Sequence, residues 1–473
     1  MKHHLQITRR SLLKGLGVAG VGALVGPHIL PSGALGANAP SKKLNIAMLA
    51  CGGRSSQILP SFINENIVAV CDVNPRQIEA IKKFGTEKHG EGGATLAKAK
   101  EYEDYRKLLD AEKSVEGVVI AAGQRWHVQL SKAALAAGKH AFCEKPMAHT
   151  VAEAREIRDI GRTTKLMTQI GTQGGSTETF RRSMEVIQAG MLGQIAEVHC
   201  WINRTFPPSA PIDMNADPIP PGLNWDFWCG PCKVLPFKNY YLGGILKVGC
   251  LAWGRWLEYG DGHLADMGAH ALNLPSRALK LGALQKASVT IPTGEKLMDS
   301  YPSATTFRWD YAAREKFVPV TVYWHDGPKA GPPEELAKEF VSTYKTDKPP
   351  TNGVLFAGEK GLLLSDAWGV GGVVKLKGDA KFRGVNDHEA LKSVPVTLPR
   401  TKGHMQEWLD ACKGGPATFQ GFASAGEIAE PAMVGIVALR LGKPIEWDSV
   451  NLKAKGMPEA DALIHRELRK KWL

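Results

Sequence analysis

Three side chains that could exchange a proton with a hydroxyl group stand out in this sequence. Lys145 directly follows the apolar run 140–143, and Asp266 and His270 share the string Asp-Met-Gly-Ala-His. An ammonium, a carboxylate and an imidazole can together withdraw a proton from a hydroxyl group. Because Asp266 and His270 are four residues apart, a helix would place both on one face. The pattern predicts an acid–base site built from distant parts of the chain.

The sequence leaves two other roles open for these residues. Most lysines are solvated surface charges, but a lysine that follows a buried strand lies at the ligand-binding edge of a sheet. Asp266 and His270 could bind a metal ion with a third ligand, for which His263 is the candidate. Because the sequence does not supply a complete ligand set, we predict no metal site.

Alternating strands and helices are predicted around Lys145. Four apolar runs have the length and β-branched content of buried parallel strands, at 44–50, 67–73, 117–122 and 140–143. Helical patterns separate or follow them, at 75–84, 105–112, 126–137 and 151–162. This alternation predicts an α/β fold, with a doubly wound, parallel Rossmann sheet over residues 42–173. Residues 87–98, rich in glycine and charge, are expected to form a surface excursion.

The residues after position 173 predict a second domain, of the α+β type. A helical pattern at 178–190 and a strand-like run at 194–202 precede a stretch rich in Pro, Gly and Trp, 207–262. Further strand-like runs follow without helices between them, at 285–291, 304–309, 317–323, 353–356 and 361–364. This order favours a mostly antiparallel sheet within residues 174–455. Helices at 402–413 and 423–442 are expected to pack back on the first domain, and residues 456–473 form a C-terminal tail.

A dinucleotide site is predicted at the turn after the first strand. The string Ala-Cys-Gly-Gly-Arg-Ser at 50–55 stands in place of Gly-x-Gly-x-x-Gly, so two of the three glycines are substituted. Alone, this string could be a tight structural turn. The second strand, however, ends in Asp72, where a carboxylate would accept hydrogen bonds from the ribose of NAD and repel the 2′-phosphate of NADP. We expect NAD to bind at Gly52, Gly53, Arg54, Ser55 and Asp72, and NADP only if Arg54 or Arg76 compensates the extra phosphate.

Trp126 and His127 follow the third predicted strand and open a helix. At the carboxyl edge of a parallel sheet they could form the wall beside the nicotinamide of a bound dinucleotide. A packed tryptophan and a helix-capping histidine are the alternative for the same two residues. The sequence does not decide between these roles.

The N-terminus has the form of an export signal. Thr-Arg-Arg-Ser-Leu-Leu-Lys at 8–14 precedes a weakly apolar run rich in Gly and Ala, with no acidic residue before it, which is typical of a twin-arginine signal. We assign residues 1–38 to this segment and predict a periplasmic protein. The formal net charge is +12, but basic and acidic residues are interleaved, which argues against nucleic-acid binding. After residue 38 no apolar run reaches the ~18 residues of a membrane span.

One pair among the eight cysteines needs its own interpretation. Cys229 and Cys232 lie in Trp-Cys-Gly-Pro-Cys-Lys, the string of the thioredoxin active site. A redox function or a metal site is possible, but no βαβ pattern leads into the string and no second Cys-x-x-Cys lies nearby. We expect a structural role, as thiols or as a local disulfide.

Several of these segments resemble the Gfo/Idh/MocA family of oxidoreductases, over nearly all of the chain from about Leu44. They are Cys-Asp-Val-Asn at 71–74, Trp126-His127, Cys-Glu-Lys-Pro at 143–146, Ile-Gly-Thr-Gln at 170–173, Asn-Trp-Asp-Phe-Trp at 224–228, Gly230-Pro231, the motif at 266–270, Leu-Arg-Leu-Gly at 439–442 and residues 466–472. The resemblance is to an exported branch of the family. It implies a Rossmann domain and an open-faced antiparallel sheet that builds a sugar pocket and commonly makes the oligomer contact.

The resemblance also implies roles for single residues. Lys145 would orient the substrate hydroxyl and assist proton transfer, His270 would be the general acid/base, and Asp266 would tune it or bind a neighbouring hydroxyl. Glu144, Lys145 and Gln173 belong to motifs expected to contact the cofactor. The chain departs from the family at Ala50 and Ser55, which replace glycines, at 123–125, where relatives often carry Pro-Asp-His, and at Gly174, where an arginine often stands.

The leading prediction is an exported oxidoreductase with tightly bound NAD that oxidises a hydroxyl of a sugar, glycoside or polyol. One alternative is a glycoside hydrolase that uses NAD for transient oxidation and elimination, and another is a non-catalytic sugar-binding protein. The intact Glu-Lys-Pro at 144–146 favours net oxidation. A homo-oligomer formed through the C-terminal sheet is expected from the resemblance.

Overall fold

Strands β1 to β6 form a parallel sheet, as the sequence predicted. The computed structural model describes residues 43–243, 249–336, 338 and 350–472, so the predicted signal segment, 1–38, lies outside the described residues. The strand order is β3-β2-β1-β4-β5-β6, and every neighbouring pair runs parallel. The strands are β1 (Asn45–Leu49), β2 (Asn66–Cys71), β3 (Lys100–Tyr102), β4 (Gly117–Ile120), β5 (His140–Cys143) and β6 (Thr168–Ile170). Because the order reverses between β1 and β4, their carboxyl ends frame the position where a doubly wound sheet binds ligands.

Helices connect these strands in chain order. They are α2 (Gly53–Phe62), α3 (Pro75–Lys88), α4 (Gly90–Ala97), α5 (Tyr105–Ala111), α6 (Gln124–Ala136) and α7 (Val151–Thr163). Side-chain caps define where three of them begin, because Asn74, Asp104 and Thr150 accept backbone N–H groups at the starts of α3, α5 and α7. The strand–helix alternation predicted from the sequence is therefore confirmed.

Most of the predicted surface excursion at 87–98 is exposed, but the prediction missed that residues 90–97 form α4, which packs on α3. Two glycines make this packing possible. A Cβ atom on Gly93 would lie 2.0 Å from the carbonyl oxygen of Gly85, so only glycine lets the two helices approach this closely. The same glycines had suggested a surface excursion, with no helix, when only the sequence was considered.

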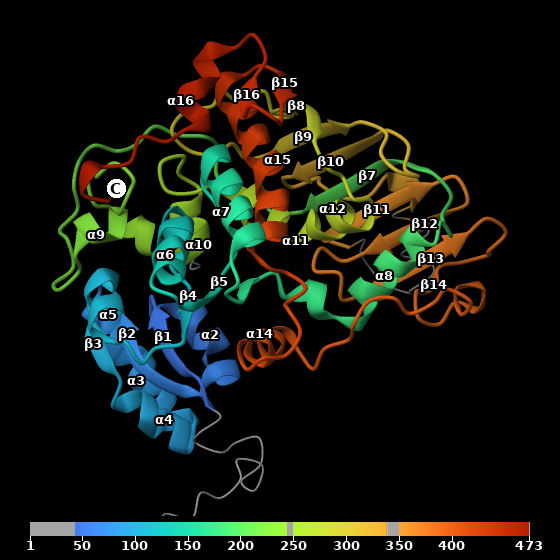
Figure 1. The fold of residues 1–473 in the computed structure, drawn as a ribbon. Helices are drawn as coiled ribbons and strands as arrows, with labels where there is room; N and C mark the ends of the chain where they lie inside the picture. Colours follow the sequence, from blue (N-terminus) through green and yellow to red (C-terminus); the bar gives the residue numbers. More distant parts are fainter. Residues whose placement is uncertain (1–42, 244–248, 337, 339–349, 473) are drawn as a thin grey trace, which may run out of the picture. The chain divides into compact units, whose positions relative to one another are not determined.

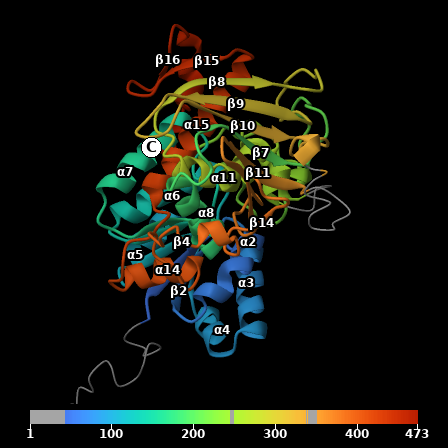
Figure 2. The same ribbon diagram turned by 90° about the vertical axis from the view of Figure 1, so that its right-hand side faces the viewer.

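The second sheet has ten strands and is mostly antiparallel, as predicted. Its order is β14-β13-β12-β11-β7-β10-β9-β8-β15-β16, and only β7 and β10 are parallel neighbours. The strands are β7 (Ile195–Ile202), β8 (Leu284–Thr290), β9 (Thr305–Tyr311), β10 (Val320–Asp326), β11 (Asn352–Gly358), β12 (Gly361–Ser365), β13 (Gly372–Leu376), β14 (Arg383–Gly384), β15 (Ile445–Asp448) and β16 (Lys453–Ala454). Figure 2 shows β8, β9, β10 and β7 in this order, one below the other.

One face of this sheet is buried under helices. Side chains of β9 and β10 alternate between buried and partly exposed, and the buried ones, including Trp309 and Trp324, pack with α8 (Glu178–Gln188), α12 (Asn273–Ala278) and α15 (Phe422–Leu441) in one core. On the opposite face, Arg308 is exposed and Tyr323 is partly exposed. This alternation is typical of an antiparallel sheet with one solvated face.

The helices α14 (His404–Cys412) and α15 pack back on the first sheet region, as expected. The indole of Trp408 on α14 contacts the rings of Phe62 and Phe142. Arg155 on α7 makes an ion pair of 2.6 Å with Glu430 on α15, which Figure 1 shows beside α7. Among the described residues α15 alone is long and apolar enough to span a membrane, but 72% of its apolar window is buried inside the protein, as in a core helix.

Short helices and loops connect β7 to β8 of the second sheet over the described part of residues 203–283. They include α9 (Trp225–Cys229), α10 (Gly249–Gly254), the π-helix η6 (Leu264–Gly268) and α11 (Ala269–Ala271). The C-terminal tail, with α16 (Asp461–Ile464) and η9 (Lys470–Trp472), returns to this region. There Trp472 packs edge-on against Trp126 and Phe227, with ring centroids 4.9 Å apart in both pairs.

Candidate active site

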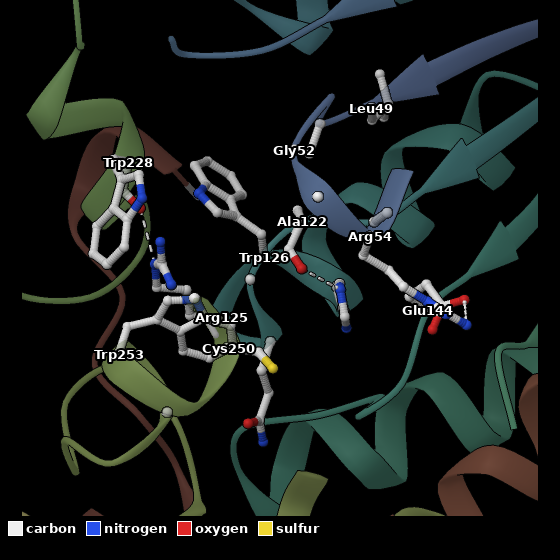
Figure 3. Close-up of a pocket in the computed structure, with 18 of the residues that line it drawn as sticks. Leu49, Gly52, Arg54, Ala122, Arg125, Trp126, Glu144, Trp228, Cys250 and Trp253 are labelled. Atoms are coloured by element: carbon white, nitrogen blue, oxygen red, sulfur yellow. Dashed lines mark hydrogen bonds and ion pairs between the residues drawn. The ribbon is translucent and has the colours of Figure 1, made fainter. Parts of the chain in front are cut away.

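A cavity of about 660 Å³ opens at the carboxyl ends of β1, β2, β4 and β5. This volume is within the ~300–1,000 Å³ of small-molecule and cofactor sites. Its lining includes the turn after β1 of the first sheet. It also includes residues of the segment between β7 and β8, up to His270. Nearly all the predicted site residues line it, namely Gly52, Gly53, Arg54, Asp72, Trp126, His127, Glu144, Lys145, Gln173, Asp266 and His270. Figure 3 shows Gly52, Arg54, Trp126 and Glu144 around the opening.

The glycine turn leaves space where a ligand could approach the backbone. A Cβ atom on Gly53 would meet no protein atom within 4 Å, and one on Gly52 would meet only Gln77, at 3.9 Å. Ser55, by contrast, does not line the cavity, because it is buried and its hydroxyl donates a hydrogen bond of 2.6 Å to the carbonyl of Ala50. Ala50 has a left-handed backbone with φ of 70°, which is strained for any residue with a side chain. Ser55 therefore stabilises the turn that Ala50 strains.

Asp72 lies at the end of β2, beside this turn. Its carboxylate accepts backbone N–H groups from Cys51 at 2.7 Å and from Asn74 at 2.8 Å. Burial raises the pKa of Asp72 to about 6, although these hydrogen bonds oppose the change. A carboxylate held here suits ribose hydroxyls and disfavours a 2′-phosphate.

Arg54 extends away from Asp72 toward β5. Its guanidinium donates to Glu144 at 2.8 Å and to Gln173 at 3.2 Å, and Figure 3 shows the contact with Glu144. Arg54 thus binds one residue of the Glu-Lys-Pro motif and one of the Gly-Thr-Gln motif. These contacts do not support a role for Arg54 in binding the 2′-phosphate of NADP. The second carboxylate oxygen of Glu144 is buried and has no hydrogen-bond partner within the described ranges, so Glu144 can accept one more donor.

Lys145 and Asp266 meet as the sequence predicted. The Lys145 Nζ donates to Asp266 Oδ1 at 2.5 Å, and Arg204 Nη1 donates to Asp266 Oδ2 at 3.0 Å. Burial alone would raise the pKa of Asp266, but the two cations lower it to about 2. Burial likewise opposes the charge of Lys145, but Asp266 raises its pKa above the ordinary value. Both groups are therefore charged at neutral pH.

His270 lines the same cavity and is neutral. Burial, and then the charge of Lys145, lower the pKa of His270 well below its ordinary value. Its Nδ1 is buried and has no hydrogen-bond partner in the part of the chain that the structure describes. The π-helix η6 leads into α11 and brings Asp266 and His270 to one side of the cavity, and such π-turns are frequent at functional sites. A neutral imidazole near an ammonium can accept a hydroxyl proton while the ammonium stabilises the oxygen left behind.

Trp126 and His127 line the cavity, but the protein holds both of them. Trp126 Nε1 donates to the carbonyl of Phe227 at 3.1 Å. His127 has ring nitrogens 2.6 Å from the carbonyl of Pro146 and 2.8 Å from that of Ala122, and burial lowers its pKa to about 4. His127 thus ties the Lys145 loop to the end of β4. A contact with cofactor stays a prediction for both residues.

Sequence reasoning missed three residues near the catalytic group. Arg204 follows β7, and Trp368 follows β12, so nothing local in the chain points to a site at His270. Arg125, noted only as a departure from the family, is buried, and its guanidinium lies 3.6 Å from the ring centroid of Trp228 (Figure 3). Only the tertiary structure brings these side chains to the cavity region.

The two thiols of the thioredoxin-like string are buried. Cys229 lies 3.4 Å from the hydroxyl of Tyr259, and Cys232 accepts a hydrogen bond of 3.1 Å from Arg466. Burial raises the pKa of Cys229 to about 11, whereas a reactive redox cysteine needs a lowered pKa. These contacts support the structural role, with Cys229 and Cys232 present as free thiols.

His263 has no metal-ligand partners in the structure. Its ring stacks on Phe206 with centroids 3.7 Å apart, and both ring nitrogens lack hydrogen-bond partners. In the part of the chain that the structure describes, no group of three or more His, Cys, Asp or Glu side chains could hold a metal ion.

The first sheet and its glycine turn define a nucleotide-binding oxidoreductase domain. Residues 44–172 match the model of the Gfo/Idh/MocA oxidoreductase family with an NAD-binding Rossmann fold. Residues 44–172 therefore carry the NAD-binding Rossmann domain of this family, which agrees with the predicted family resemblance and cofactor class.

Known enzymes resemble this chain over different extents. Inositol 2-dehydrogenase from Salmonella paratyphi B is 35% identical over 135 residues, which is 28% of this chain and 37% of that enzyme. The chain thus spans little more than a third of the length of such relatives. The structure of aldose-aldose oxidoreductase from Caulobacter crescentus, complexed with glycerol, has a TM-score of 0.55 at 16% identity and covers 86% of this chain and all of that one (100%). Levoglucosan dehydrogenase, in complex with NADH and levoglucosan, has a TM-score of 0.54 at 14% identity over 85% of this chain and 98% of that one. At these identities the two structures support the fold alone.

Proposed function

We propose that this protein is an exported NAD-dependent oxidoreductase that oxidises a hydroxyl group of a sugar, glycoside or polyol. The observation that carries the proposal is the convergence of Lys145, Asp266 and His270 on the cavity that begins at the glycine turn. A site for a proton acceptor thus adjoins a site for a dinucleotide. Oxidising an alcohol carbon needs both.

The cavity residues fit a bound dinucleotide. The space beside Gly53 leaves room for a pyrophosphate at the N-terminus of α2, and the unpaired oxygen of Glu144 offers a buried acceptor. Asp72 would hold the ribose hydroxyls. When bound, NAD supplies the hydride acceptor, which no amino-acid side chain provides.

The chain's own residues would divide the proton chemistry among them. The charged Lys145 donates a hydrogen bond to the substrate oxygen and stabilises negative charge as it develops there. The neutral His270 accepts the hydroxyl proton, since its Nδ1 has no partner among the described residues. Asp266 keeps Lys145 charged and fixes its position, and Arg204 holds the other oxygen of Asp266.

A panel of sugars, glycosides and polyols tests the reaction. We expect a lasting rise in absorbance near ~340 nm with at least one compound and no release of free sugar. Free sugar without lasting reduction would instead identify the glycoside-cleaving cycle. Lys145→Met should abolish the signal, whereas Lys107→Met, at an exposed lysine of the same domain, should leave it unchanged.

Export and assembly are further parts of the proposal. Residues 1–38 support export by the twin-arginine route, which carries folded cargo and suits a protein that must take its cofactor along. We expect the wild-type protein in the periplasmic fraction with nicotinamide bound, and Arg9→Lys with Arg10→Lys to retain it in the cytoplasm. The periplasmic protein is purified and denatured, and the released small molecules are analysed by mass spectrometry. If no nicotinamide is found, tight binding is contradicted. The partly exposed face of the second sheet is the proposed oligomer contact, to be tested by light scattering of the purified protein.

A further inference from the structure

Trp368 is the one contribution of the second sheet to the cavity. Among the described residues that line the cavity, no other lies after His270 in the chain. The ring centroids of Trp368 and His270 are 5.9 Å apart, with the planes inclined by 49°. The indole is partly exposed, and its N–H makes no hydrogen bond to the part of the protein that the structure describes. A partly exposed indole that lines the cavity thus lies beside the proposed proton acceptor.

The loop between β12 and β13 holds this indole in place. The carboxylate of Asp366 accepts the backbone N–H of Trp368 at 2.8 Å and that of Val370 at 3.3 Å, and also accepts the N–H of Gly371. The neighbouring Ala367 is buried and donates its N–H to the side chain of Asn352 on β11. A loop closed on one carboxylate in this way positions its side chain with little freedom.

Gly174 allows the loop to reach the site. A Cβ atom at Gly174 would lie 1.6 Å from the carbonyl oxygen of Trp368, so any other residue would push the loop away. Gly174 directly follows Gln173, which contacts Arg54 at the cofactor end of the cavity. The Trp368 backbone is therefore packed directly against the motif that is proposed to bind the cofactor.

We propose that Trp368 is the platform on which the substrate ring lies, and that the substrate is a pyranose sugar or glycoside and not an acyclic polyol. A pyranose has a rigid face of C–H groups that can cover an indole, while its hydroxyl edge extends to Lys145 and His270. Pockets of this kind combine an apolar wall with a few polar groups that fix orientation. A flexible alditol lacks a preformed face and loses more conformational freedom on the same wall. This inference rests on the proposed oxidation of a hydroxyl.

Matched pairs of ring and open-chain substrates test the inference. D-glucose with D-glucitol, and D-galactose with galactitol, are compared for wild-type protein, Trp368→Ala and Trp368→Phe. We expect the wild type to prefer each pyranose. Trp368→Ala should lower kcat/KM for the pyranose by ~10- to 100-fold while leaving the alditol within ~3-fold, and Trp368→Phe should recover most of the loss. Val370→Ala, at an exposed side chain of the same loop, is the control and should behave as wild type.

A binding measurement separates this inference from the proposed function. Saturation-transfer NMR with methyl β-D-glucopyranoside and methyl β-D-galactopyranoside reads contact of the sugar C–H groups without any turnover. We expect transfer in the wild type and its loss in Trp368→Ala and in Gly174→Ala, which displaces the loop but keeps the indole. Preference of the wild type for alditols, equal losses on both members of a pair, or sugar contacts that survive both substitutions would overturn the inference. If both variants lose pyranoside binding but the wild type oxidises no substrate, the platform role of Trp368 is supported and the proposed oxidation is contradicted.

Discussion

Replacing Asp266 by asparagine should destabilise the protein through the charges that it leaves behind. In the structure Asp266 holds Lys145 at 2.5 Å and Arg204 at 3.0 Å. Asparagine keeps the shape of the side chain but removes the negative charge, so two cations remain close together, and Lys145 is largely buried. Removing one member of a buried ion pair commonly costs ~3–5 kcal/mol. Because Arg204 is partly exposed, we expect the lower half of this range at pH 7.

A double variant shows whether the cost comes from the unpaired charge. Asp266→Asn with Lys145→Met removes both partners of the ion pair. Removing both partners costs less unfolding free energy than removing one and leaving the other charge buried and unpaired. We expect the double variant to recover at least half of the lost unfolding free energy, as measured by urea denaturation at pH 7. The single variant should also lose substrate oxidation, because Lys145 is no longer held in position.

The pH dependence of the wild type provides an independent check. The pKa of Asp266 is lowered from 3.8 to about 2 in the folded protein, so its contribution to stability is fully present above pH ~4 and is lost as the pH falls toward 2. A shift of this size corresponds to about 2 kcal/mol. Asp266→Asn should lack this part of the decrease in stability at low pH. A single variant within ~0.5 kcal/mol of the wild type at pH 7, or a double variant less stable than the single one, would refute the reasoning.

Three further predictions follow from the geometry of the cavity. His270→Gln should lower kcat/KM by ~10²- to 10⁴-fold, and because the pKa of His270 is lowered well below 6.5, the wild-type profile from pH 6 to 8 should show no step from this group; a titration near pH 6.5 that disappears in the variant would contradict this. Asp72→Ala should weaken NAD binding by ~10-fold or more and reduce the preference over NADP, as read by fluorescence titration with both dinucleotides, whereas equal losses for both would speak against ribose recognition. Ala50→Gly should relieve the left-handed backbone and leave the protein equally stable or up to about 1 kcal/mol more stable in urea, with NAD binding retained; a clear destabilisation would show that the turn is not strained.

Local patterns predicted the first sheet and much of the site. The apolar runs 44–50 and 140–143 became β1 and β5, because strands buried on both faces are short and continuously apolar. Lys145 and Asp72 follow such strands, so the prediction of the strands also placed these two residues at the ligand-binding edge of the sheet. Residue types predicted that Lys145, Asp266 and His270 converge, and in the structure Lys145 donates a hydrogen bond to Asp266.

Elements that depend on distant neighbours were missed. The pattern of Gly and charge at 87–98 hid α4, because its packing relies on the approach of Gly93 to Gly85. Strands β13 and β15 are short and lie next to the two edges of the second sheet, and β15 pairs with β8, which lies far earlier in the chain. Segments with such weak local preference form strands only when a neighbouring strand supplies the hydrogen bonds.

The sequence by itself determined the Rossmann sheet and the glycine turn after its first strand, because strand and helix periodicities are local properties of the chain. It also named Lys145, Asp266 and His270 as candidates for proton transfer. The tertiary structure alone decided that Arg204 and Trp368 join them. Both follow strands of the second sheet, so their distance from the site depends on strand order, and that of Trp368 depends also on one close backbone contact at Gly174. Such contacts arise from the packing of segments far apart in the chain, which no local pattern encodes.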